Sequence, residues 1–239
     1  MTRRANSPTT GQINLPGQAA APDGPNDLTG MFVMHWAFRR DLDQFAAAAI
    51  HTPVEDRAVW RALARRWSLF RHVLHDHHTG EDEGLWPALR SLADAAGAAV
   101  LDAMAAEHHD IDPLLASVAE GLDRMAATPD PDARAALEVR VVAARERLGR
   151  HLAHEERDAL ALIQRHLPPA EWERISKVYF EQAKTPREIA ALVAWLLHDM
   201  PEPATARLLS GAAPVRVLWR LALRRPFARR ERRAFRYAG

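Results

Sequence analysis

The sequence predicts an all-α protein organised as an up-down-up-down four-helix bundle with additional C-terminal helices. Only 11 of the 239 residues are glycine, whereas the helix formers alanine, leucine, arginine and glutamate are frequent. Four segments place apolar residues at alternating intervals of three and four, the pattern of a helix with one buried face. Short connections separate these segments, so consecutive helices are expected to run antiparallel.

Composition restricts the kinds of site that the chain can build. Hydrophobic residues make up 48% and charged residues 26%, which suits one globular domain with accessory segments. Cysteine is absent, so disulfides, thiolate metal sites and thiol nucleophiles are excluded. The net charge of +1 argues against a general binder of polyanions.

The chain divides into three parts. Residues 1–25 are rich in Ser, Thr, Pro, Gly and Asn and read as a disordered leader. Residues 26–168 form the bundle, and residues 169–239 form a helical, Arg-rich extension. No apolar stretch follows the N-terminal arginines and none approaches eighteen residues, so we expect a cytoplasmic protein.

The first two helices each bury a histidine. The first is expected to begin at Asn26 or Asp27, either a good N-cap, and to end near residue 50, with His35 on its apolar seam. The second, which follows Pro53, carries His77 and Glu81 on its seam. Its register leaves three further histidines on other faces, namely His72, His75 and His78.

The third and fourth helices repeat this arrangement. The third spans about residues 94–125 and has His108 on its seam, with His109 off it. The fourth begins after Asp130, an N-cap followed by proline, and carries His151 and Glu155. Counting residues from the connections at 1.5 Å per residue brings the ligand positions of the four helices to a similar depth.

A bound metal explains these buried ionisable groups better than a metal-free core does. One histidine on an apolar seam is usually satisfied by a protein partner. Two unpaired buried glutamates, however, would each cost several kcal/mol of desolvation or remain protonated. The candidate metal ligands are His35, His77, Glu81, His108, His151 and Glu155.

The number and type of these groups suit two metal ions that share carboxylate bridges. Six nitrogen and oxygen ligands are too many for one tetrahedral zinc. Mixed imidazole and carboxylate ligation favours iron, with manganese or zinc as alternatives. Ferritin-like bundles use Glu-x-x-His pairs with glutamates on all four helices, whereas this chain has His-x-x-x-Glu.

The sequence resembles the hemerythrin-like family, also called the HHE cation-binding domain. The resemblance covers about residues 26–166 and rests on the segments MHWAFRRDL, HHTGEDEGLWPAL, EHHDIDPLL and HLAHEERDAL. It implies that Glu81 and Glu155 bridge two irons. His35 and His77 would then bind one iron, and His108 and His151 the other. An open position would bind dioxygen, peroxide or nitric oxide.

Two departures from oxygen-carrying hemerythrins shift the expected chemistry. Those proteins have a fifth histidine, four residues along the third helix, where this chain has Asp112. They also carry His-x-x-x-x-Asp on the fourth helix, where this chain has Glu155. We therefore expect peroxide chemistry, sensing or iron handling rather than simple oxygen carriage. Asp112 is either an additional ligand or an exposed carboxylate.

The extension adds two features. Helices are expected over residues 171–182 and 186–200, and the second carries an apolar stripe that needs the bundle or a second protomer as partner. From Arg207 onward, ten arginines face one acid, Glu231. Such a segment can bind nucleic acid or an anionic membrane surface. A helix docked on the bundle with solvated arginines is the favoured interpretation, because the whole chain uses arginine almost to the exclusion of lysine.

Three functional hypotheses remain open. The first is a non-heme di-iron protein that binds or senses dioxygen or nitric oxide. A second is an enzyme that consumes peroxide or another small oxidant. The third is a metal-free or iron-storing helical scaffold whose Arg-rich tail binds nucleic acid or an anionic membrane surface.

Overall fold

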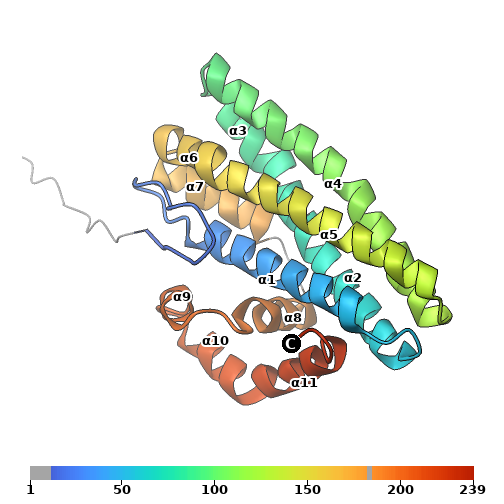
Figure 1. The fold of residues 1–239 in the computed structure, drawn as a ribbon. Coiled ribbons are helices and arrows are strands. Elements are labelled where there is room, and N and C mark those ends of the chain that lie inside the picture. Colours follow the sequence, from blue (N-terminus) through green and yellow to red (C-terminus); the bar gives the residue numbers. More distant parts are fainter. Residues whose placement is uncertain (1–11, 182–184) are drawn as a thin grey trace, which may run out of the picture.

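Four long helices form the bundle that the sequence predicts. The computed structural model describes residues 12–181 and 185–239. Residues 1–11 of the expected leader lie outside the described residues, as does Gln182, the last residue of the helix expected over residues 171–182. Helix α2 packs against α4, α4 against α5, and α5 against α1 (Figure 1). Among the described residues there is no strand. The long helices are α1 (Thr29–His51), α2 (Arg57–Gly80), α4 (Ala95–Ala127) and α5 (Pro131–His154).

A π-helical turn interrupts two of the four helices near their ends. Helix α2 continues into η1 (Glu81–Leu85) and then α3 (Trp86–Arg90), and α5 continues into η2 (Glu155–Ala159) and α6 (Leu160–His166). A π-helical turn holds an extra residue relative to an α-helical turn, so side chains beyond it lie on a different face. Residues downstream of Glu81 and Glu155 therefore depart from the register of the preceding helix.

Helix caps agree with the sequence except at the first helix. The Asp130 carboxylate accepts a hydrogen bond from the Ala133 amide, as predicted for an N-cap. At the first helix Leu28, rather than the predicted Asn26 or Asp27, occupies the N-cap position, although the Asp27 carboxylate accepts a hydrogen bond from the Thr29 amide in the first turn. Asn26 is buried instead, and its side-chain amide donates to the carbonyls of Ile163 and Leu167. A contact with the end of the bundle thus takes precedence over capping.

The described part of the leader lies against the bundle. Ile13 and Leu15 are buried within the hydrophobic core. Gln18 donates a side-chain hydrogen bond to the carboxylate of Glu156, and the Ala19 amide donates another. Residues 12–25 thus differ from the expected disordered leader, since two apolar anchors and two hydrogen bonds hold them in place.

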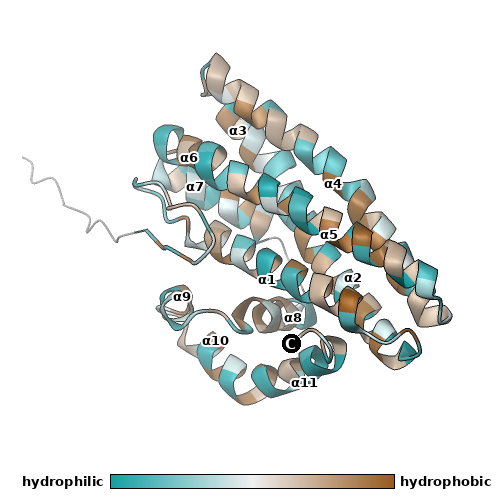
Figure 2. Ribbon diagram, viewed as in Figure 1, coloured by the Kyte–Doolittle hydropathy of each residue, from teal (hydrophilic) through white to brown (hydrophobic). Residues whose placement is uncertain are grey.

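The C-terminal helices cover one side of the bundle (Figure 1). Helix α8 packs on α1 and α11 packs on α2. The apolar stripe of α8 is only partly covered within the chain: Leu197 is buried and Leu192, Val193 and Leu196 are half-buried, but Ile189 is 48% exposed. The outer face of α11 remains largely hydrophilic (Figure 2). The elements are α7 (Pro169–Ile175), η3 (Ser176–Phe180), α8 (Pro186–Leu197), α9 (Glu202–Leu208), α10 (Ala213–Leu218), η4 (Trp219–Leu223) and α11 (Arg224–Ala234).

Candidate metal centre

The six side chains selected from the sequence meet inside the bundle. His35, His77, Glu81 and Glu155 each offer one ligand atom, and these atoms all lie within 4.8 Å of one another. A second group places ligand atoms of His108 and His151 within the same mutual distance, together with His78. All the residues of both groups are buried. The seams of four helices thus converge as the spacing predicts.

The two glutamates lie between the imidazoles of the first group and those of the second. Carboxylate oxygens of Glu81 are 3.2 Å from His77 Nε2 and 3.4 Å from His108 Nε2. Glu155 Oε2 is 3.3 Å from His35 Nε2 and 3.8 Å from His151 Nε2. Each carboxylate therefore faces one imidazole of either group, which is the position of a bridging ligand.

The local backbone helps to explain this arrangement. Each π-helical turn begins at one of the two glutamates, and the Glu81 amide reaches the carbonyls of both His77 and His78. His77 and His78 precede this turn in regular α2, where neighbouring side chains are about 100° apart, so His77 faces His35 of α1 while His78 faces His108 of α4. π-helical turns inside α-helices frequently occur at functional sites.

Acidic side chains outside the two groups orient three of the imidazoles. Glu156 lies 3.0 Å from His35 Nδ1, Asp82 2.9 Å from His108 Nδ1, and Glu107 2.8 Å from His151 Nδ1. A carboxylate that accepts the Nδ1–H leaves the Nε2 lone pair directed toward a metal. The sequence did not identify these partners. Two of them directly follow the glutamates Glu81 and Glu155, which is the signal that could have revealed them.

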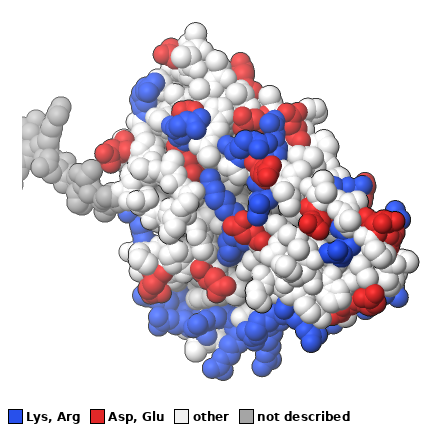
Figure 3. Space-filling model, viewed as in Figure 1, with Lys and Arg blue, Asp and Glu red and all other residues white. Residues whose placement is uncertain are grey.

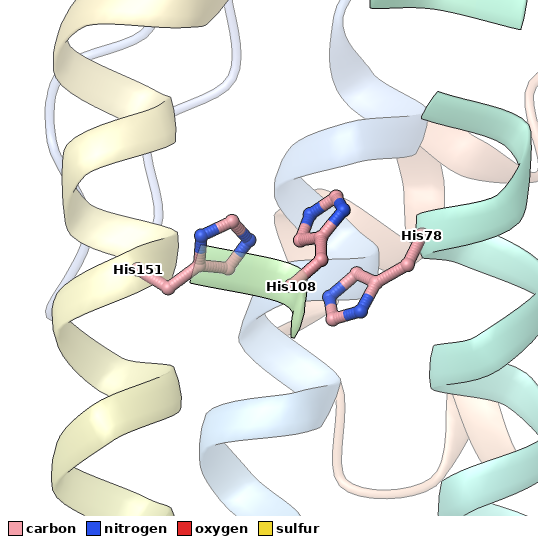
Figure 4. Close-up of side chains that lie close together, drawn as sticks. All are labelled: His78, His108 and His151. Atoms are coloured by element: carbon pink, nitrogen blue, oxygen red, sulfur yellow. The ribbon is translucent and has the colours of Figure 1, made fainter. Parts of the chain in front are cut away.

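His78 is the residue of the centre that the sequence placed wrongly. Its side chain was expected on another face, yet it is buried, and its ring stacks on His108 with centroids 3.8 Å apart. Figure 4 shows the imidazoles of His78, His108 and His151 converging from α2, α4 and α5. The expected positions hold for His72, His75 and His109, which are exposed, and Asp112 is also exposed. The fifth buried histidine thus comes from α2 rather than from the third helix.

The centre contains polar atoms that the protein does not satisfy. Both oxygens of Glu81 and of Glu155 are buried and lack a hydrogen-bond partner among the described residues, as do the Nε2 atoms of three histidines, His78, His108 and His151. Leaving such groups unpaired away from water costs free energy comparable to several lost hydrogen bonds. A cation is the partner that these acceptors share, so the donor set fits bound metal.

Electrostatics within the centre are tightly linked. Burial lowers the pKa of His35, but the carboxylates of Glu155 and Glu156 outweigh burial and raise this pKa to about 10. Burial together with the charge of Glu155 raises the pKa of Glu81 to about 8. Burial and the neighbouring charge of His35 lower the pKa of His77 to about 3. Without an added cation, protons on some of these groups must balance the buried negative charge.

A short segment of the extension covers the centre, and a cavity reaches it. A side chain at Gly84 would meet the Tyr179 ring at 2.3 Å, so the glycine permits η3 to lie directly on η1. Phe180 lies 6.1 Å from the His77 ring, measured between centroids. Next to this segment, a cavity of about 830 Å³ between the bundle and the extension includes His77 and Phe180 in its wall. His77 is therefore the candidate ligand that borders this cavity.

Comparison with known proteins supplies the decisive observation. The sequence model of the hemerythrin HHE cation-binding domain matches residues 27–163, more than half of the chain. The chain belongs to this family. No curated protein and no solved structure matches it. The match to the HHE domain contains α1 to α5 and every residue of both groups, whereas the C-terminal helices α7 to α11 lie outside it.

Proposed function

We propose that the protein holds two non-heme iron ions and binds dioxygen or reacts with a small oxidant such as peroxide or nitric oxide. The observation that carries this proposal is the set of buried, unsatisfied carboxylate and imidazole atoms between two groups of histidines. Membership of a cation-binding family supports the metal. Iron is the choice that imidazole and carboxylate ligands favour in the absence of cysteine.

Each candidate ligand has a distinct role. His35 and His77 would bind one ion, and the second group would bind the other. Glu81 and Glu155 would bridge the pair, because each lies between imidazoles of both groups. The bound iron pair would supply electrons for redox chemistry with the small ligand.

The rest of the chain would keep the centre ordered and dry. Asp82, Glu107 and Glu156 accept from the Nδ1 atoms and hold the imidazoles in one tautomer. Phe38 and Phe180 lie against the His77 ring and exclude water from it. The cavity beside His77 provides an approach for a small ligand from one side of the bundle.

His78 changes the expectation drawn from the missing fifth histidine. Its Nε2 atom is buried and unpartnered, and it shares a group with His108 and His151. The donor set then comprises five imidazoles and two carboxylates. Reversible dioxygen binding thereby regains support alongside oxidant chemistry.

Metal analysis with an optical spectrum tests the proposal directly. Protein purified after growth in iron should contain near two irons per chain and should show charge-transfer absorption from a bridged ferric pair. A Glu81→Ala/Glu155→Ala variant should lose the metal. A matched Glu120→Ala/Glu146→Ala variant, which removes two exposed glutamates of α4 and α5, should retain it. Absence of bound metal in the parent protein, or equal metal in both variants, contradicts the proposal.

Paired histidine variants then test the fifth ligand. His78→Ala should weaken iron binding by about 10- to 100-fold, whereas His75→Ala, on the exposed face of α2, should leave it unchanged. Competition with a chelator measures the affinity. Mixing the reduced protein with dioxygen, peroxide or nitric oxide then distinguishes a reversible spectral change from multiple turnover.

A further inference from the structure

The C-terminal helices present a surface that the metal centre does not use. Elements α10, η4 and α11 follow one another without a break, and their arginines gather along one edge of the molecule (Figure 3). Eight of these arginines are exposed, and none of the eight forms an ion pair within the part of the chain that the structure describes. The eight are Arg216, Arg220, Arg224, Arg225, Arg229, Arg230, Arg232 and Arg233. We refer to them, with the apolar residues described next, as the basic surface.

The acidic residue of this stretch does not neutralise the surface. Glu231 is buried and hydrogen-bonded to Arg66 of the bundle, 2.8 Å away. The remaining positive charge therefore faces solvent. The whole chain carries a net charge of only +1, so the excess of positive charge on this edge comes from where the charged residues lie and not from the overall composition.

Protruding aliphatic side chains accompany these arginines. Leu221 is 82% exposed, and Val217 and Leu218, one helical turn earlier, are 54% and 44% exposed. Leu221 also lines a hollow together with Arg225 and Arg229. Apolar side chains inside a strongly charged surface gain nothing from water, so their position points to a partner with both anionic and apolar groups.

We propose that this basic surface binds the headgroup region of an anionic lipid bilayer. Arginines would contact lipid phosphates while Leu221 and its neighbours enter the boundary with the acyl chains. Among the described residues, no helix is long and apolar enough to cross a membrane. The contact would accordingly lie in the plane of the interface.

Nucleic acid fits the surface less well. Single-stranded binding surfaces stack bases on exposed aromatic rings, but Trp219 and Phe227 of this segment are buried. A duplex would neutralise the arginines without accommodating Leu221. The bilayer uses both the charge and the aliphatic side chains.

Vesicle co-sedimentation of the full chain tests this inference. The protein should bind vesicles of phosphatidylcholine mixed with phosphatidylglycerol, should not bind phosphatidylcholine alone, and should dissociate as salt is raised. An Arg225→Gln/Arg229→Gln variant should lose about 25-fold in partition coefficient, at about fivefold per arginine. An Arg71→Gln/Arg150→Gln variant, which removes the same charge from exposed sites on the bundle, should bind normally.

A second pair of variants examines the apolar contribution. Leu221→Ser should lower the partition coefficient about tenfold, whereas Val139→Ser, at a 69% exposed site on α5, should not. Equal losses in both members of either pair overturn the proposal. So do equal binding to both vesicle types, no binding to either, or tighter binding to a nucleic-acid duplex than to the anionic vesicles. Unchanged iron content and circular dichroism would establish that the variants remain folded.

Discussion

Glu155 and Asp41 are both fully buried carboxylates of the same bundle, but their surroundings differ. Oxygens of Asp41 accept hydrogen bonds from Arg66 at 2.6 Å, from Trp195 at 2.7 Å and from Arg40 at 2.8 Å. Both oxygens of Glu155 lack any hydrogen-bond partner among the described residues, and Oε2 faces the Nε2 atoms of His35 and His151. Fixed arginine charges compensate Asp41, whereas the charge of Glu155 is compensated either by protonation of a neighbouring imidazole such as His35 or by a cation from outside.

This difference separates a structural ion cluster from a binding site. Arg66 also pairs with Glu231, so the Asp41 cluster ties α1 and α2 of the bundle to α8 and α11 of the extension. The residues of the candidate metal centre instead join the helices of the bundle to one another. Burial of charge alone therefore does not indicate function, but unsatisfied acceptors that share one space do.

Removing the metal should produce the largest effect. Chelation should destabilise the iron-loaded protein by several kcal/mol, equivalent to a fall of roughly 10 °C in melting temperature, because the buried acceptors lose their cation. Thermal unfolding with and without chelator measures this change. The Glu81→Ala/Glu155→Ala variant is the control and should not respond. Identical melting curves for the parent protein would show that its centre is satisfied without metal, as the Asp41 cluster is.

Breaking the Asp41 cluster should have a comparable but smaller effect. Arg66→Ala leaves the buried Asp41 carboxylate without its main cation and should cost about 3–5 kcal/mol in the free energy of unfolding. Adding Asp41→Asn to this variant should recover part of the loss, since the uncompensated charge is then gone. Chemical denaturation measures both variants. Iron content should stay unchanged, and its loss would show that the two clusters are not independent.

The sequence predicted the convergence of the centre better than its details. Helical spacing selected the histidine and glutamate seams, because the four histidines lie in regular α-helix and the two glutamates stand at the first position of a π-helical turn, so all six keep the regular register. Glu156 was missed because it lies inside the π-helical turn η2, where the regular register no longer holds. His78 was missed although it lies in regular α2, because it faces His108 of α4 beside the seam that His77 occupies. Metal binding by the six selected residues remains a prediction.

Long-range pairing explains what else the sequence could not provide. Asp41 pairs with Arg66 and Trp195, which lie 25 and 154 residues away in the chain. No local sequence pattern indicates such partners. Similarly, Asn26 resembled a helix cap but binds carbonyls near the end of the bundle. Residues whose partners come from another element are accessible only once the fold is known.

Removing the carboxylate that orients the His108 imidazole, while keeping the histidine, tests whether that carboxylate contributes to iron binding. Asp82→Asn replaces the carboxylate at His108 Nδ1 and should weaken iron binding by about 10- to 100-fold while changing the stability of the metal-free protein little. Glu83→Gln, at an exposed neighbouring position, serves as the control. Chelator competition provides the affinity. Equal affinity in both variants would mean that Asp82 does not orient the imidazole.

The smallest expected effect is the loss of the stability that Asp41 contributes when the pH is lowered. Although burial opposes it, the charges of Arg66 and Arg40 hold the pKa of Asp41 below its usual value of 3.8. A carboxyl whose pKa is depressed by folding contributes stability above its unfolded pKa and loses it as pH falls through the folded value. The stability difference between the parent protein and Asp41→Asn should therefore be constant down to about pH 4 and shrink below it.

Glu231 should behave in the opposite way within the same cluster. Burial raises its pKa despite the charge of Arg66. Its ionisation therefore costs the folded state free energy as pH rises through the raised pKa, and Glu231→Gln should relieve this cost above pH 4.5 rather than below it. Urea unfolding from pH 3 to pH 7 measures both differences on metal-free protein. Parallel profiles for the two variants would contradict the assignment of Asp41 as the charged anchor of the cluster and of Glu231 as its weaker acid.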